Sequence, residues 1–300
     1  MPVVELAGVT KAYEAKVAVR DLSLSIDAGR MFGLLGPNGA GKTSSIRMMM
    51  GITLPDSGTV KLFDQPFERK SLERVGYLPE ERGLYKKMKV IEQLVFFGRL
   101  HGLTAGEATH RATRWAERLE IDDALPKKTE ELSKGMQQKI QFIGSLLHDP
   151  GLIVMDEPFS GLDPVNAKLL EKTLLELKDQ GKAILFSTHR MDQVERLCDS
   201  ICLVNNGEAV LSGRMREIKS RYERNHVEVE FEGSAEFLKS SEIAEAKNFS
   251  GHAEIKLKHG GDAQKLLHEA SAMAKIYRFE LMEPSLEEIF IRTVGGKVDA

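Results

Sequence analysis

A glycine-rich segment that directly follows an apolar run constrains this chain more than any other feature of its sequence. The run Met31–Leu35 has the length and composition of a buried strand, and from Ser44 to Met50 the apolar residues recur at helical spacing. Between them stands Gly36-Pro37-Asn38-Gly39-Ala40-Gly41-Lys42-Thr43. Glycines let backbone N–H groups curl round an anion without Cβ clashes, and the helix that follows points its positive end at the same place. This order of strand, loop and helix predicts a phosphate-binding loop in an α/β fold.

The spacing of the loop residues assigns them expected roles. Lys42 is placed to reach the β- and γ-phosphates of a nucleotide, and the Thr43 hydroxyl is placed to bind Mg²⁺. The alternative is a glycine-rich turn with no ligand, which the flanking strand and helix disfavour. The predicted nucleotide contacts are Gly36, Pro37, Asn38, Gly39, Ala40, Gly41, Lys42, Thr43 and Ser44.

A second apolar run ends in two carboxylates. Leu152–Met155 reads as a buried strand, and Asp156 and Glu157 follow it. Alone, two acids at this place are more often a solvated strand end. Downstream of a phosphate loop, a carboxylate at the end of a parallel strand lies where ligands bind. We therefore expect Asp156 to hold Mg²⁺ through water and Glu157 to orient or deprotonate the attacking water.

The pattern along the chain predicts two domains. Up to residue 218 apolar strands alternate with helices, with a helical subdomain at about 88–150, which indicates a mainly parallel sheet with helices on both faces. The pair Asn206-Gly207 predicts the tight turn of a closing hairpin. A charged helical connector is expected at Lys219–Arg224. Residues 219–300 then read as a small α+β domain.

Composition excludes several classes of protein. The net charge is only −3, so a nucleic-acid partner has no electrostatic support. No apolar run approaches the roughly 20 residues that cross a bilayer, and no signal segment is visible. Cys198 and Cys202 have no second pair and no nearby histidine cluster, so they read as buried small residues rather than as half a metal site. The chain is expected in the cytosol.

These motifs, in this order, resemble the ATP-binding cassette (ABC) ATPases from Val3 to about Gly213. Leu132-Ser133-Lys134-Gly135-Met136 is similar to the family signature, whose residues meet the γ-phosphate held by the other subunit. By this resemblance Ser133 supplies a hydroxyl and Gly135 allows close backbone approach; Ser133 also suits the N-cap of a helix. Ser160-Gly161-Leu162-Asp163 matches the loop that crosses between subunits.

The resemblance also assigns two aromatic side chains. Tyr13 lies where the family has an aromatic residue that stacks on adenine; the alternative is a surface tyrosine in a loop, and the motif spacing favours stacking. His189, after Ser187-Thr188, matches the switch histidine near the γ-phosphate. A lone histidine is usually structural, but its order and its place at a strand end favour the functional interpretation.

Two positions depart from the family pattern. Lys134 and Met136 stand in a signature that is usually LSGGQ, and Glu80 replaces a glutamine that contacts the metal. Glu80 either binds Mg²⁺ or belongs to a charged loop with Glu81 and Arg82. Both substitutions, and the tail at 282–290, look like those of ATPase subunits of bacterial and archaeal sodium- and drug-efflux exporters.

The resemblance implies that the chain is the ATP-binding and ATP-hydrolysing subunit of an ABC transporter, which couples ATP-driven dimer closure to substrate export. The cofactors are ATP and Mg²⁺, and two copies close head to tail over two ATP molecules. The expected partner is a separate integral-membrane permease, and the expected place is the inner face of the cell membrane. There are three alternatives: a soluble regulatory module without turnover, an ABC ATPase acting on ribosomes, and an ABC ATPase acting on DNA. The ribosome type has two phosphate loops in one chain, whereas this chain has one. The DNA type has long coiled coils, whereas no sustained heptads lie between Thr43 and Leu132.

Overall fold

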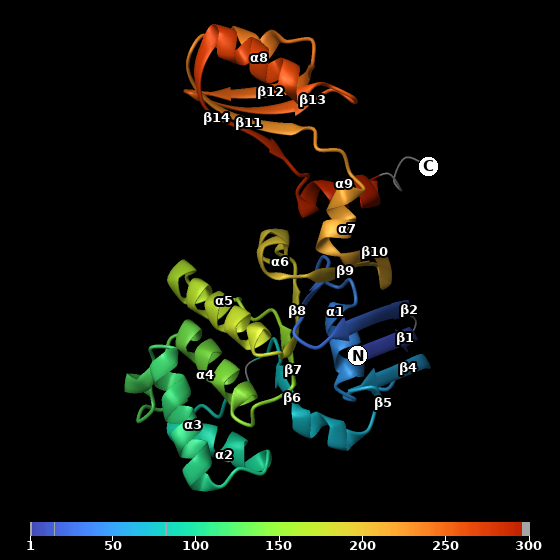
Figure 1. Cartoon of the computed structure of the whole chain (residues 1–300). Coiled ribbons are helices and arrows are strands. Elements are labelled where there is room, and N and C mark those ends of the chain that lie inside the picture. The colour runs from blue at the N-terminus through green and yellow to red at the C-terminus, as the bar shows by residue number, and fades with distance from the viewer. Residues whose placement is uncertain (1, 15, 82, 296–300) are drawn as a thin grey trace. The chain divides into compact units, whose positions relative to one another are not determined.

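The computed structural model describes residues 2–14, 16–81 and 83–295, and the chain divides into two compact units. The first unit is Met1–Met215 and the second is Arg216–Ala300. The predicted boundary lay between residues 218 and 219. Among the described residues, no sheet is shared between the two units, and each unit has its own hydrophobic core (Figure 1).

A six-stranded sheet forms the centre of the first unit. Its order is β10-β9-β3-β8-β7-β6; all neighbours are parallel except the hairpin pair β9 and β10. The strands, in sheet order, are β10 (Glu208–Arg214), β9 (Ser200–Asn205), β3 (Met31–Leu35), β8 (Ala183–Thr188), β7 (Leu152–Asp156) and β6 (Val75–Leu78). The three central strands are wholly buried, which explains why they read as unbroken apolar runs. The predicted hairpin is confirmed, with its turn at Asn206-Gly207.

A separate antiparallel sheet carries the N-terminus of the first unit. Its order is β2-β1-β4-β5, with β1 (Pro2–Tyr13), β2 (Lys16–Asp27), β4 (Ser57–Leu62) and β5 (Gln65–Pro66). Helix α1 (Lys42–Met49) contacts β2 and β4 on one side and β7 on the other, so one apolar core joins the two sheets. Strands β4, β5 and β6 were not predicted, because they are short and their segments carry little alternation.

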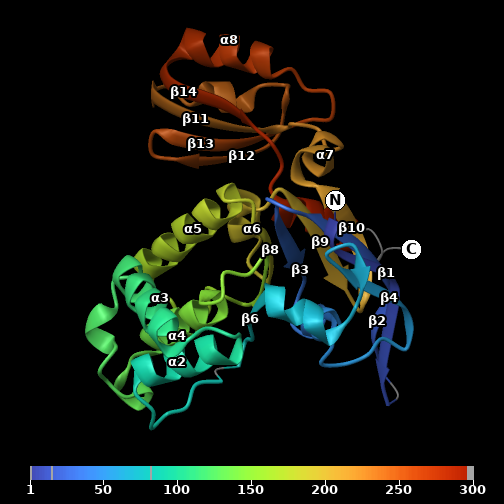
Figure 2. The ribbon, with the colours of Figure 1, turned by 60° about the horizontal axis from the view of Figure 1, so that its bottom comes forward.

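Helices cover the remaining surfaces of the first unit. Helices α5 (Pro164–Asp179) and α6 (Met191–Leu197) pack on β8 and β3 respectively. Helices α2 (Val90–Leu100), α3 (Ala105–Arg118) and α4 (Lys134–Leu146) contact one another and form the predicted helical subdomain (Figure 2). Short 3₁₀ turns lie at Arg69–Arg74, Asp122–Ala124 and Thr129–Glu131.

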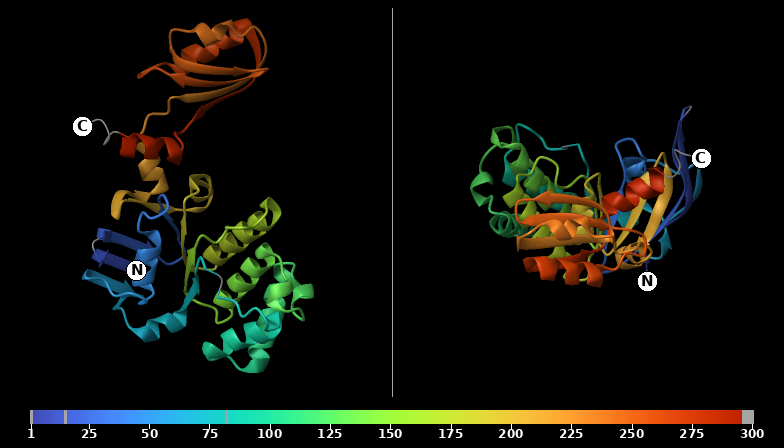
Figure 3. Two further views of the ribbon diagram at one scale, coloured as in Figure 1. Left: turned by 180° about the vertical axis from the view of Figure 1, so that it is seen from behind. Right: turned by 90° about the horizontal axis from the view of Figure 1, so that it is seen from above.

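The second unit is a four-stranded antiparallel sheet with a helix along one face (Figure 3). Its order is β12-β13-β11-β14, and α8 packs against β14. The elements are β11 (His226–Gly233), a 3₁₀ turn (Glu236–Lys239), β12 (Ile243–Phe249), β13 (His252–Leu257), α8 (Ala263–Met273), β14 (Ala274–Met282) and α9 (Leu286–Gly295). The predicted α+β class of this region is confirmed, although the sequence pattern did not predict strand β12.

The predicted connector helix at Lys219–Arg224 is wrong in position. Helix α7 covers Met215–Ser220, and residues 221–225 lie outside it. Met215 and Ile218 are buried one helical turn apart, so they give the helix its apolar side. The following charged residues have no such side, and the helix ends before them. In the parts of the chain that the structure describes, no helix has the length and apolarity to cross a membrane.

Candidate functional site

The glycine loop joins β3 to α1 in a conformation that only glycine fits. Gly36 has φ 151° and Gly41 has φ 109°. A Cβ on Gly36 would stand 2.2 Å from the Val204 carbonyl oxygen, and one on Gly41 would stand 2.4 Å from the Ala18 carbonyl oxygen. Side chains at these positions would therefore collide with backbone, which explains the two glycines.

A cavity of about 400 Å³ lies at the mouth of this loop. It brings together the loop, Asp156 and Glu157 at the end of β7, and Glu80, which are far apart in the sequence. Its lining residues are Lys16, Ala18, Asn38, Gly39, Gly41, Lys42, Thr43, Ser44, Glu80, Asp156 and Glu157. The sequence did not point to Lys16 and Ala18, because nothing in the local pattern of β2 marks them.

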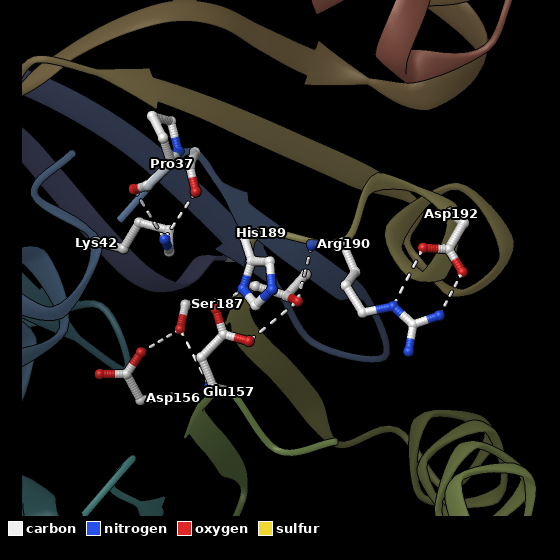
Figure 4. A network of polar contacts seen from close by, with 10 residues as sticks. Pro37, Lys42, Asp156, Glu157, Ser187, His189, Arg190 and Asp192 are labelled. Carbon is white, nitrogen blue, oxygen red and sulfur yellow. Dashed lines mark hydrogen bonds and ion pairs between the residues drawn. The ribbon is translucent and has the colours of Figure 1, made fainter. Parts of the chain in front are cut away.

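Lys42 is buried against its own loop. Its Nζ donates hydrogen bonds to the carbonyl oxygens of Gly36, at 2.7 Å, and Pro37, at 3.2 Å (Figure 4). Burial lowers the pKa of the ammonium, and the nearby carboxylates, Glu157 first, oppose this effect. The loop thus holds a cation at the cavity, where it can attract phosphate.

Asp156 ends β7 with one carboxylate oxygen paired and the other not. Its Oδ1 accepts a hydrogen bond from the Ser187 hydroxyl on β8 (Figure 4). Its Oδ2 is buried and has no hydrogen-bond partner in the described residues. A buried carboxylate oxygen without a hydrogen-bond donor is costly, so this position suits a cation or a water held by one.

Glu157 and His189 contact each other directly beside Asp156. The His189 Nδ1 lies 2.9 Å from the Glu157 Oε1, and the Thr188 hydroxyl donates to Oε2 at 3.2 Å. The Glu157 backbone N–H donates to the Ser187 carbonyl oxygen at 3.1 Å, and Glu157 has φ 52°. A left-handed backbone is uncommon for glutamate, and here it aims the carboxylate at β8. Ser187 and Thr188 are supports to which the sequence gave no role of their own.

The signature-like residues lie at the start of α4 and do not line the cavity of their own chain. Ser133 is the N-cap: its hydroxyl oxygen accepts a hydrogen bond from the Met136 N–H at 3.2 Å. Lys134 is exposed. A Cβ on Gly135 would meet only ordinary contacts, at 3.6 Å from the Gly161 carbonyl oxygen and from Leu162. Nothing within the described chain therefore requires glycine at this position.

Helix α4 also holds the loop that carries Glu80. The buried Gln141 donates from Nε2 to the carbonyl oxygens of Pro79 and Glu81, both at 3.2 Å. Glu80 between them is exposed and faces the cavity. In the described part of the chain, no three acidic, histidine or cysteine side chains converge closely enough to hold a metal ion. A metal here would thus need other ligands, such as phosphate oxygens or water.

Tyr13 is not among the residues that line the cavity, although it neighbours one of them. It ends β1, is 39% exposed, and pairs in register with Lys16, which does line the cavity. The Lys11 Nζ lies 5.7 Å from the centre of its ring. The exposed ring is therefore accessible for stacking.

The matching family models and the similar proteins all point to one family. Residues 19–160 match the family model described as ABC transporter, and residues 213–294 match the one described as the C-terminal domain of DrrA1-3-like ATP-binding proteins. YhaQ of Bacillus subtilis, an uncharacterized ABC transporter ATP-binding protein, is 44% identical over 96% of this chain and 97% of its own length. The linearmycin resistance ATP-binding protein LnrL of the same organism is 32% identical over 96% of each.

Solved structures agree with this assignment. The ATP-binding subunit of an ABC transporter superposes with a TM-score of 0.68 and 29% identity, covering 73% of this chain and 92% of its own. CbiO1 of Clostridium perfringens, part of the transporter complex CbiONQ, has a TM-score of 0.65 and 25% identity, with 73% and 91% covered. The chain therefore belongs to the ATP-binding subunits of ABC transporters, the subunits that bind and hydrolyse ATP.

Proposed function

We propose that this chain binds ATP with Mg²⁺ in the cavity at the glycine loop and that two copies close head to tail over two ATP molecules. The observation that supports it most is the convergence of Lys42, Asp156 and Glu157 on one cavity. The nucleotide contacts are those of the loop from Gly36 to Ser44, with Tyr13 stacking on adenine.

The protein groups divide the chemistry between them. Thr43 and Asp156 would hold Mg²⁺, with Glu80 as a further oxygen ligand; bound Mg²⁺ supplies positive charge that neutralises the phosphates. The unpaired Asp156 Oδ2 fits this role. Glu157 accepts the proton of the attacking water, and His189, held 2.9 Å from Glu157, stabilises the γ-phosphate.

A second copy would complete the site. Ser133 and Gly135 do not line the cavity of their own chain, yet the first turn of their helix is exposed or half-buried, with its Met136 N–H capped by Ser133. Such a turn favours a phosphate presented by another chain. The absence of any need for glycine at position 135 within the described chain supports close approach from outside.

Closure and reopening of the pair would drive a separate membrane permease, at the inner face of the cell membrane. Relatives similar to this chain are the linearmycin resistance ATP-binding protein LnrL and the Nod factor export ATP-binding protein I of Ralstonia nicotianae. The latter is 32% identical over 99% of this chain and 95% of its own length. These names support export as the direction of transport.

Replacing Glu157 by Gln tests the assignment. The variant should keep ATP binding because Lys42 and the loop are intact, but its turnover should fall by about 10²–10⁴-fold because the base is lost. Unhydrolysed ATP should then hold two copies together at protein concentrations too low for association without nucleotide, which size-exclusion chromatography with light scattering measures with ATP and without it.

Glu236→Gln is the matched control, because Glu236 is a highly exposed glutamate of the second unit. It should keep wild-type turnover. Wild-type turnover in the Glu157→Gln variant, or a variant that binds ATP and stays monomeric, would contradict the proposal. ATP binding by the wild type with no turnover would favour the regulatory module instead.

A further inference from the structure

Strand β12 of the second unit lies at the edge of its sheet with one flank open. It pairs on one side with β13, and no described strand lies on its other side. Every residue from Ala244 to Phe249 is exposed. An edge of this kind presents unpaired backbone N–H and C=O groups, which are a template for another strand.

Charged side chains of β12 lie opposite side chains of the other sign on β13. In register, Glu245 lies opposite Lys256 and Lys247 lies opposite Glu254 on β13. Successive residues of a strand point to opposite faces, so Glu245 and Lys247 share a face and Ala246 points to the other. Among the residues that the structure describes, Glu245 and Lys247 take part in no ion pair; their nearest opposite charges are the register partners on β13.

One register of β12 against itself matches these charges. If two copies pair antiparallel about Ala246, Glu245 of each lies directly opposite Lys247 of the other. Centring the pair on Glu245 or on Lys247 would instead set like charges against each other. Across the four strands of the favoured register the order is Glu254, Lys247, the second copy's Glu245 and its Lys256, so the sign alternates throughout.

We propose that β12 is a self-association edge, where the second unit pairs antiparallel with β12 of a second copy about Ala246. The contact joins two four-stranded sheets into one of eight strands. It uses no nucleotide and none of the residues at the phosphate loop. It is therefore distinct from the ATP-dependent closure proposed above, and it holds two copies together between rounds of hydrolysis.

A charge exchange between two single variants tests the register. Glu245→Lys alone sets two lysines against each other across the contact, and Lys247→Glu alone sets two glutamates together, so each should weaken the nucleotide-free dimer by at least about tenfold. An equimolar mixture of the two restores opposite charges at both pairs and should restore the dimer. Repulsion from Lys256 or Glu254 within a chain is the same in the mixture as in the single variants, so it cannot account for the recovery.

The measurement is sedimentation equilibrium of the full chain without nucleotide, over a range of salt concentrations. The wild-type dimer should weaken as salt rises, because exposed ion pairs are screened. A wild type that is monomeric without nucleotide at tens of micromolar, single variants that dimerise like the wild type, or a mixture that does not recover would each overturn the proposal.

A cysteine at the symmetry axis gives a second readout that does not depend on affinity. In the proposed register the two Ala246 residues face each other, so Ala246→Cys should form a disulfide-linked dimer under mild oxidation. The control Asn248→Cys lies opposite residue 244, and its two copies stand about 13 Å apart, beyond disulfide reach. Cys198 and Cys202 are buried and present in both variants. Equal cross-linking of the two variants would exclude this register.

Failure of this proposal is distinguishable from failure of the ATPase mechanism. Glu245→Lys leaves the cavity untouched, so Glu157→Gln combined with it should still dimerise when ATP is added. Loss of that ATP-dependent dimer would show that closure over ATP needs the β12 contact. It would overturn the proposal that β12 associates independently of ATP.

Discussion

Three glycines lie in the two segments that we propose contact ATP, and their own chain constrains them differently. At Gly36 and Gly41 the requirement is internal, because a Cβ would stand 2.2 or 2.4 Å from a backbone oxygen and both residues have positive φ. At Gly135 the nearest atoms are at 3.6 Å, and alanine is accommodated within the chain. The described chain therefore places no steric limit on a side chain at position 135, and the limit that we propose there is the partner's nucleotide.

Gly135→Ala separates folding from function on this basis. Alanine favours helix over glycine by up to about 1 kcal/mol, so the free energy of unfolding should be unchanged or slightly raised. The methyl group should obstruct the partner's nucleotide, so ATPase activity should fall at least about tenfold. Urea unfolding and a steady-state ATPase assay measure the two effects.

Gly41→Ala is the contrasting variant, since its methyl group meets the Ala18 carbonyl within the same chain. It should lose stability as well as activity. Full activity of Gly135→Ala would contradict the assignment of this position to the shared site.

Among the elements, α2 and α4 enclose a second cavity that the ATPase chemistry does not use. It has a volume of about 290 Å³ and is lined mainly by apolar side chains and two histidines. The rings of His101 and His148 stack with centres 3.7 Å apart and 5° between their planes, and the His148 Nε2 lies 3.1 Å from the Val75 carbonyl oxygen. Burial, and next the His101 ring, lower the pKa of His148 to about 4.

This stack predicts how stability changes with pH. His148 stays neutral in the folded chain down to about pH 4, while the unfolded chain binds a proton below about pH 6.5. Because the unfolded state holds more protons in that window, the free energy of unfolding should fall as pH drops from about 6.5 to about 4. His148→Phe keeps an aromatic ring without a titrating group, so its loss of stability should be smaller. Urea unfolding at intervals between pH 7 and pH 4 measures this, and parallel profiles for both proteins would contradict it.

At the scale of the whole molecule, two units with separate cores share one chain. The core of the first unit joins both of its sheets, and that of the second lies between its sheet and α8. The residues at the phosphate loop and its cavity all belong to the first unit. Nucleotide should thus stabilise one unit and not the other.

Calorimetry of the Glu157→Gln variant tests this division. ATP at one hundred times its Kd should raise the free energy of unfolding of the first unit by about 2.7 kcal/mol. The transition of the second unit should stay where it is without ATP. A single transition that shifts as a whole would show that the two units unfold together and would contradict the prediction.

Much of the first unit could be predicted from the sequence, because its signals are local. The run before Gly36, the spacing from Gly36 to Thr43 and the acids after Met155 each carry their own pattern, and so does the turn at Asn206-Gly207. Strands β4, β6 and β12 could not be predicted in this way. They are stabilised by pairing with distant strands rather than by their own composition.

The phosphate loop, the strand that ends at Asp156 with Glu157 after it, and the family to which they point can all be read from the sequence alone. Three features require the folded chain: Glu157 contacts His189 across β7 and β8, one oxygen of Asp156 lacks a partner among the described residues, and Gly135 is unconstrained within its own chain. The difference arises because a local motif fixes its own backbone. Distances between side chains on separate strands depend on sheet order and register, which the whole chain sets through its packing.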